Sequence, residues 1–147
     1  MKLQEALFEA TKSCNNAVEE EGGIILHNPS IPDEFEFIKL RNQNTGTEIA
    51  PVLWTADRQE YAEKIIPKIM KGMRHYASFH THPRFLPIPS RIDLNELFPG
   101  FPINYIYSQV ALAITEWNTN AEFVSSFSKA FNVNEENVEE KEIADLS

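Results

Sequence analysis

The segment of residues 78–94 limits the possible fold more than any other part of this chain. Its sequence, SFHTHPRFLPIPSRIDL, begins with alternating histidines, continues with three prolines and closes with a serine and an aspartate. We expect residues 76–82 to form a β-strand, in which successive side chains point to opposite faces. Proline cannot donate to a β-ladder, so the strand should stop at Pro83 and a stiff loop should follow it.

The two histidines of this strand, His80 and His82, are expected to project from the same face. Their Cβ atoms should lie roughly 7 Å apart, a separation at which both imidazoles can bind one zinc ion. An ordinary polar strand face also carries alternating histidines, and it is the simpler interpretation when the two residues are taken alone.

Ser90 and Asp93 have the spacing of a helix N-cap, and a short helix is predicted over residues 90–98. Such a cap needs no metal. Asp93 would nevertheless lie in the first turn, where the helix dipole favours the ionised carboxylate that binds zinc. Ser90 could accept a backbone N–H and still direct its own proton to a substrate oxyanion. Two histidines and one aspartate would leave a fourth zinc position for water, as in catalytic sites.

A catalytic site of this kind also requires a general base, which must come from another segment. Residues 18–26, VEEEGGIIL, offer three adjacent glutamates before an apolar strand. Such a run of acids is most often a solvated helix end. The two glycines that follow favour a functional interpretation, because glycine lets a backbone approach a neighbouring strand closely. The residues alone leave the choice among the three glutamates open.

Together these residues resemble the JAMM motif of the JAB/MPN (Mov34/PAD-1) metalloproteases. In that motif His-x-His is followed after seven residues by Ser-x-x-Asp, and a Glu-x-x-Gly lies upstream, as in this chain. The resemblance covers roughly residues 1–117 and is greatest to stand-alone prokaryotic or phage members. It implies an α/β fold of the MPN-like, cytidine-deaminase-like type, with a mixed β-sheet flanked by helices.

The resemblance implies a zinc-dependent isopeptidase or peptidase. His80, His82 and Asp93 would bind Zn²⁺, Glu20 would act as general base and later as general acid, and Ser90 would stabilise the oxyanion. Glu19 paired with Gly22 is the other possible register for the base.

The same resemblance implies a protein or peptide substrate, first of all the C-terminus of a ubiquitin-like modifier. Two alternatives stay open, a cell-wall peptide hydrolase of the phage-tail type and a catalytically silent MPN scaffold. Phe85 and Leu86 lie between the expected ligands and are our candidates for substrate contact, since exposed apolar side chains there would have a function. Alternatively, they fold back onto the core.

Charge and composition narrow the class of partner. The net charge of −9 argues against a nucleic-acid partner. The sequence contains no long apolar run and no apolar signal-peptide core near its start, so we expect a cytoplasmic protein without a membrane partner. The single cysteine, Cys14, rules out an internal disulfide and a cysteine-rich zinc cluster. The oligomeric state is left open.

Hydrophobic periodicity and turn residues predict the remaining elements. We expect one domain over residues 1–131 and an acidic tail over residues 132–147 that is frayed or disordered. The predicted helices cover residues 2–18 and a segment that is capped by Asp57 and kinks or ends near Ile66, while residues 121–131 are ambiguous but suit a helix by their phenylalanine spacing. The predicted further strands cover residues 22–28, 34–42, 48–54, 105–107 and 110–117.

Overall fold

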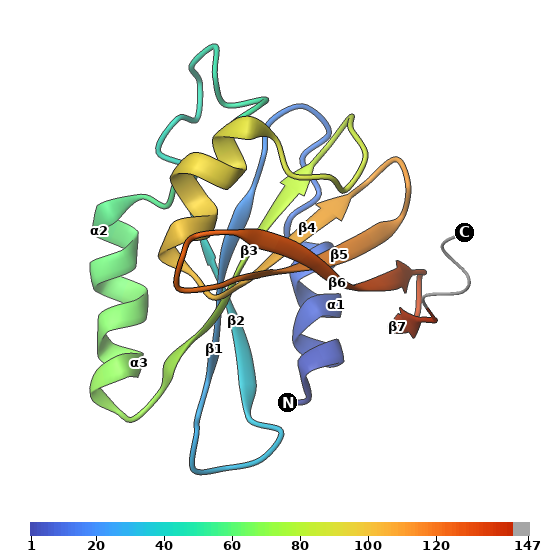
Figure 1. The fold of residues 1–147 in the computed structure, drawn as a ribbon. Helices are drawn as coiled ribbons and strands as arrows, with labels where there is room; N and C mark the ends of the chain where they lie inside the picture. The colour runs from blue at the N-terminus through green and yellow to red at the C-terminus, as the bar shows by residue number, and fades with distance from the viewer. Residues whose placement is uncertain (143–147) are drawn as a thin grey trace.

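A mixed β-sheet of seven strands runs through the structure, a computed structural model that describes residues 1–142 (Figure 1). The strand order is β2-β1-β3-β4-β5-β6-β7. Strands β3 and β4 are parallel, and the other neighbours are antiparallel. The predicted α/β class, with a mixed sheet flanked by helices, is confirmed. The strands are β1 (Gly22–His27), β2 (Phe35–Leu40), β3 (Arg74–His82), β4 (Ile103–Ser108), β5 (Ala113–Thr119), β6 (Ser125–Val133) and β7 (Val138–Lys141).

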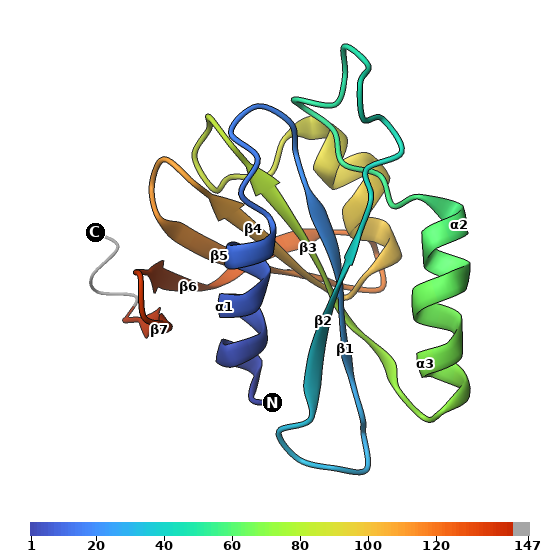
Figure 2. The ribbon, with the colours of Figure 1, turned by 180° about the vertical axis from the view of Figure 1, so that it is seen from behind.

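Helix α1 (Leu3–Ser13) packs against one face of the sheet, as the view from behind shows (Figure 2). Its apolar stripe, spaced by three and four residues, buries Leu7 and Cys14 completely against the sheet. The helix ends at Ser13 and not at residue 18 as predicted. The reason is Asn16, whose side-chain oxygen accepts hydrogen bonds from two following backbone N–H groups and so replaces the helical pattern.

A second helical segment covers another apolar cluster on the opposite face of the sheet. It begins with the predicted cap, in which the Asp57 side chain accepts from the backbone N–H of Glu60 at 3.0 Å. We predicted that this helix kinks or ends near Ile66, and the structure shows that it continues past that residue. A π-helical turn lies before Pro67 and widens the helix where the proline lacks a donor, with the Ile66 N–H bonded to the Tyr61 carbonyl. The parts are α2 (Arg58–Glu60), η1 (Tyr61–Ile65) and α3 (Ile66–Met70).

The segment before this helix is a folded loop, so the predicted strand over residues 48–54 is wrong. A single isolated bridge joins Asn42 to Ala56 in this part of the described chain. The Asn42 side chain takes the place of a β-ladder: its amide donates to the carbonyls of Glu20 (3.0 Å) and Leu53 (2.8 Å). Pro51 could not have donated to a ladder in any case. One buried asparagine thus ties this loop to the start of β1.

The C-terminal part of the described chain also differs from the prediction. Residues 125–133 form β6, not a helix, and β6 crosses the boundary predicted after residue 131. The acidic segment continues into β7, in which Val138 is 3% exposed. Asn134 closes the turn between the two strands by accepting two backbone N–H bonds, so Val133 and Val138 reach the same core cluster. The frayed tail predicted from residue 132 is therefore wrong through Lys141, and its last five positions, 143–147, lie outside the described residues.

No helix in the described part of the chain has the length and apolar character needed to cross a membrane. The remaining helical turns, η2 (Asp93–Leu97) and η3 (Phe98–Gly100), lie between β3 and β4 and carry part of the candidate site.

Candidate metal centre

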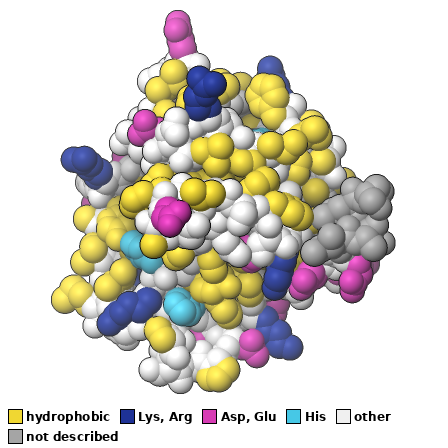
Figure 3. Space-filling model, viewed as in Figure 1, with side chains coloured by type: hydrophobic (Ala, Val, Ile, Leu, Met, Phe, Trp, Pro, Cys, Tyr) yellow, Lys and Arg dark blue, Asp and Glu magenta, His cyan; other side chains and the backbone are white. Residues whose placement is uncertain are grey.

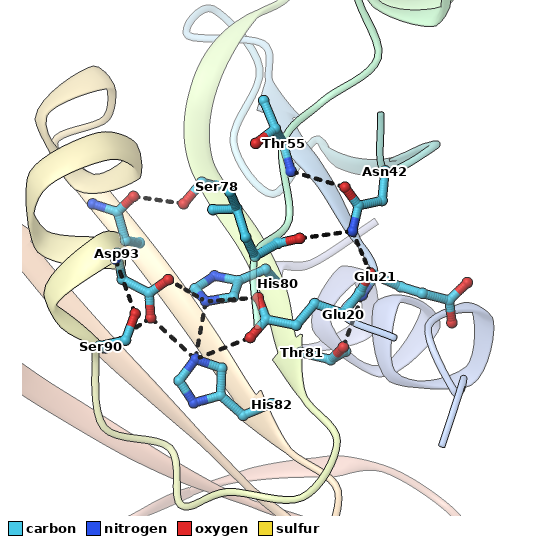
Figure 4. A network of polar contacts seen from close by, with 12 residues as sticks. Glu20, Glu21, Asn42, Thr55, Ser78, His80, Thr81, His82, Ser90 and Asp93 are labelled. Carbon is cyan, nitrogen blue, oxygen red and sulfur yellow. Dashed lines mark hydrogen bonds and ion pairs between the residues drawn. The ribbon is translucent and has the colours of Figure 1, made fainter. Parts of the chain in front are cut away.

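The end of β3 provides two buried histidines. β3 is paired on both sides, with β1 and with β4, so its backbone is fixed there by two ladders. His80 is fully buried, His82 is 4% exposed, and their Nε2 atoms face each other at 3.2 Å (Figure 4). Phe79 points the other way, into the core beneath α1. The predicted alternation of the strand is therefore confirmed.

Asp93 reaches the histidines from the first turn after the proline loop. Its carboxylate oxygens lie 3.1 Å from His80 Nε2 and 3.0 Å from His82 Nε2. Ser90 orients this carboxylate through a reciprocal pair of bonds at 3.0 Å: the Ser90 N–H donates to Asp93 Oδ2, and the Asp93 N–H donates to Ser90 Oγ. Because Ser90 Oγ only accepts in this pair, its own proton remains available for another acceptor.

Glu20 approaches from the start of β1. Its carboxylate oxygens lie 4.0 Å from His80 Nε2 and 3.8 Å from His82 Nε2, and the residue is 3% exposed. Gly22 pairs with His80 in the ladder, where an added Cβ would collide with the Phe79 carbonyl oxygen and the Trp54 ring. The close approach predicted for the glycines is confirmed, and it is what brings Glu20 next to the histidines.

The neighbouring glutamates point elsewhere. Glu19 accepts a hydrogen bond from the backbone N–H of Gly46, in the loop that follows β2, at 3.1 Å. Glu21 forms an ion pair with Lys39 on β2 at 2.7 Å. Of the three adjacent acids, the structure therefore brings Glu20 into the site, and the two others stabilise the loops around it.

The group formed by Glu20, His80, His82 and Asp93 fits a bound divalent cation. One ligand atom from each residue lies within 4.8 Å of the others, and all four residues are buried. Ligands of a tetrahedral ion such as zinc lie roughly 3.3 Å from one another. The separations among the two Nε2 atoms and the Asp93 oxygens, 3.0 to 3.2 Å, are close to that value. Glu20 lies farther out, with its oxygens 3.8 to 4.0 Å from the histidine nitrogens.

Two buried polar atoms of this group have no hydrogen-bond partner among the described residues, Glu20 Oε1 and His80 Nδ1. Buried polar groups are nearly always satisfied, so a carboxylate oxygen that has no donor and lies 4.0 Å from His80 Nε2 indicates a position for a cation or a water molecule. The unpaired oxygen of Glu20 is the observation that independently supports a ligand at this position.

Electrostatics at the site also favour positive charge. Burial raises the pKa of Glu20 to about 7, although the charges of the two histidines act to lower it. Burial acts in the same direction on Asp93, but the charge of His80 and hydrogen bonds from both histidines outweigh it and hold the pKa of Asp93 below its usual range. Burial acts to lower the pKa of His80, yet Asp93 and Glu20 raise it overall. These shifts share one cause: positive charge between the two buried carboxylates is stabilised, whether it comes from a protonated histidine or from a bound cation.

The loop between the ligands is held by His82 and by two residues that sequence reasoning did not identify, Ser108 and Thr115. His82 Nδ1 bonds to the Leu86 carbonyl at 3.0 Å, Ser108 Oγ donates to the Phe85 carbonyl at 2.7 Å, and Thr115 Oγ1 donates to the Pro87 carbonyl at 2.6 Å. Ser108 on β4 and Thr115 on β5 are buried polar residues. A hydroxyl at such a position could have been recognised as a group that needs a partner.

Comparison with known proteins is informative at the level of family and fold. The family model of prokaryotic homologs of the JAB domain matches residues 5–122, a range that contains every residue of the candidate site. The solution structure of protein DSY2949 from Desulfitobacterium hafniense is similar, with a TM-score of 0.58 and 19% identity, over 94% of this chain and 86% of that chain. At this identity the likeness concerns the fold alone. No curated protein matches the chain.

Proposed function

The chain belongs to the family of prokaryotic homologs of the JAB domain, and from this premise we propose that it is a zinc-dependent metallopeptidase. It would hydrolyse peptide or isopeptide bonds. The single observation that carries this proposal is the buried convergence of Glu20, His80, His82 and Asp93 within 4.8 Å. Structural ion pairs seldom combine four buried titratable groups with an unpaired carboxylate oxygen, whereas catalytic metal sites do.

In this proposal His80, His82 and Asp93 would hold zinc through the two Nε2 atoms and the carboxylate that already face one another. Histidine nitrogen and carboxylate oxygen are the donor types that catalytic zinc sites use, with one position left open. Bound zinc would supply Lewis acidity, which polarises the scissile carbonyl and makes a water molecule more acidic.

Glu20 takes the proton from the attacking water and returns it to the leaving amine. The carboxylate has a free oxygen for this purpose, and burial excludes bulk water that would compete for the proton. The Ser90 hydroxyl donates a hydrogen bond to the oxyanion. Its oxygen already accepts from the Asp93 N–H, which fixes the orientation of the side chain.

The substrate of this proposed enzyme is a protein or peptide, with the C-terminus of a ubiquitin-like modifier as the first candidate and the cytoplasm as the expected compartment. The phage-tail type of cell-wall peptidase is the second candidate. The silent scaffold has less support, because a scaffold needs no buried glutamate with an unpaired oxygen beside two histidines.

A panel assay tests the proposal. The zinc-loaded protein is incubated with ubiquitin-like fusions, unstructured peptides and peptidoglycan fragments, and products are identified by mass spectrometry. Cleavage of protein or peptide substrates that stops on zinc removal supports the proposal. Cleavage confined to peptidoglycan supports the cell-wall alternative, and a zinc-loaded protein that cleaves no member of the panel supports the scaffold.

A further inference from the structure

An apolar cavity opens directly beside the candidate metal centre. It has a volume of about 340 Å³. Half of its lining belongs to the site itself, namely Glu20, His82 and Ser90, and the other half is apolar, namely Val52, Phe85 and Ile88. A group placed in this cavity would therefore touch the proposed general base, one metal ligand and the proposed oxyanion donor at the same time.

The apolar lining is unusually exposed. Phe85 is 58% exposed, Ile88 59% and Val52 43%, and Leu86 beside them is 59% exposed. In the space-filling view, hydrophobic side chains gather over the loop that follows β3 (Figure 3). Contiguous exposed apolar groups of this kind in a soluble protein commonly mark a binding site. The possibility that Phe85 and Leu86 fold back onto the core is ruled out by these exposures.

The backbone of the loop is fixed in the conformation that exposes these side chains. Three consecutive carbonyls, those of residues 85, 86 and 87, are bonded to buried side chains from β4, β3 and β5. Prolines at positions 83, 87 and 89 restrict the remaining backbone freedom. The loop cannot easily turn its apolar side chains inward, and a site fixed in this way loses little entropy when it binds.

We propose that this cavity binds one large aliphatic or aromatic side chain of the substrate, on a residue adjacent to the scissile bond. The inference rests on the proposed peptidase function and adds a substrate class to it. The occupant follows from the lining, since the three groups that are not part of the metal centre are all apolar and lie next to the reacting groups. A glycine at this substrate position would leave the cavity empty. An aspartate side chain would lose its hydrating water without gaining a hydrogen-bond partner.

Cleavage specificity provides the first test. A positional-scanning peptide library is digested, and the cut sites are mapped by mass spectrometry. We expect a preference of about tenfold or more for leucine, isoleucine or phenylalanine over glycine and aspartate at one position next to the cut, the usual size for an apolar pocket. Ile88→Asp should remove that preference. Met70→Asp is the matched control, because Met70 is 82% exposed on α3, away from the site, and should leave the preference unchanged.

A second measurement does not depend on turnover. The zinc-loaded Glu20→Gln variant is titrated with N-acetylleucinamide and, separately, with N-acetylaspartamide, while methyl resonances are followed by NMR. Shifts of the Val52 and Ile88 methyl groups with the leucine compound alone support the pocket. Equal shifts with both compounds, or no shifts, overturn it.

The two tests separate the pocket from the reaction. Hydrolysis without any preference for an apolar neighbour would overturn the pocket and leave the proposed function standing. Leucine-specific methyl shifts in a protein that cleaves nothing would support the pocket as a peptide-binding site and contradict the proposed function.

Discussion

His82 Nδ1 lies 3.0 Å from the carbonyl oxygen of Leu86, so the loop after β3 orients a residue of the candidate metal centre. A carbonyl can only accept, and Nδ1 must therefore carry the proton in this bond. Because this bond keeps one proton on Nδ1, Nε2 is the ring atom that would give up its proton to bind a metal, and it is the atom that faces Asp93 and His80. Such bonds behind a metal-binding histidine fix both its tautomer and its direction.

The support of this loop should matter for zinc binding as well as for stability. Ser108→Ala removes the donor to the Phe85 carbonyl and the acceptor for the Ala111 N–H. We expect a loss of about 1–3 kcal/mol in the free energy of unfolding, because buried groups lose their partners. Zinc affinity should fall about tenfold. Urea unfolding and competition with a zinc indicator measure these effects, with exposed Ser126→Ala as control; unchanged values would show that the loop needs no such support.

Of the histidines, His80 and His82 should be needed for the metal, and His27 should not. His80→Ala is expected to lose bound zinc, whereas His27→Ala, at the far end of β1, should retain about one ion per chain. Chelators should stop turnover and added zinc should restore it. Elemental analysis of the purified variants measures the metal. Wild-type protein with no affinity for zinc would contradict the proposed centre.

Glu20 should be needed for turnover but not for metal. Glu20→Gln is expected to keep zinc and to slow hydrolysis at least a hundredfold, within the range of about 10²–10⁴ for general acid–base groups. Glu19→Gln should stay active, because Glu19 bonds to the loop at Gly46. Rates and zinc contents of both variants are compared. An active Glu20→Gln with an inactive Glu19→Gln would place the base at Glu19.

Ser90 has two roles that one control can separate. Ser90→Ala should reduce the rate about a hundredfold or more through the lost oxyanion donor. It should also cost about 1 kcal/mol of stability through the lost cap. Asp57→Ala removes a cap of the same kind at α2, away from the centre, and should lower stability without lowering the rate. Equal loss of activity in both variants would show that Ser90 has only a structural role.

Cys14 should be inert in the folded protein. Burial raises its pKa from 9.0 to about 12, so the reactive thiolate is nearly absent at neutral pH. Thiol reagents should react in urea but not in buffer. Because the thiol ionises more readily in the unfolded chain, stability should fall as the pH rises from about 9 towards 12. Cys14→Ala should lack that contribution, and rapid modification of native protein would refute the burial of the thiol.

Local rules were sufficient for much of the candidate site. The two-residue period of a strand placed His80 and His82 on one face, and the cap pattern placed Ser90 against Asp93. The family and the fold class inferred from this motif were confirmed. These features depend on residues close in sequence, where backbone geometry limits the possibilities.

Elements that depend on distant partners were predicted less well. The phenylalanines of residues 121–131 suit a helix, but pairing with β5 and β7 makes this segment a strand. Residues 48–54 have the composition of a strand, yet the Asn42 side chain takes the backbone bonds that a ladder would have used. The acidic segment joined the sheet because Val138 could be buried in the core.

By itself, the sequence determined the chemical types at the centre and their local spacing, two imidazoles, a capped carboxylate and a nearby run of glutamates. Only the tertiary structure decided which glutamate enters, because that choice depends on the register of β1 against β3 and on the space that Gly22 leaves open. It also decided that Phe85 and Ile88 stay exposed beside the site, since the bonds that hold their loop come from β3, β4 and β5. The geometry between neighbouring residues follows from the local sequence, whereas the packing of distant segments forms only when the strands pair in one register.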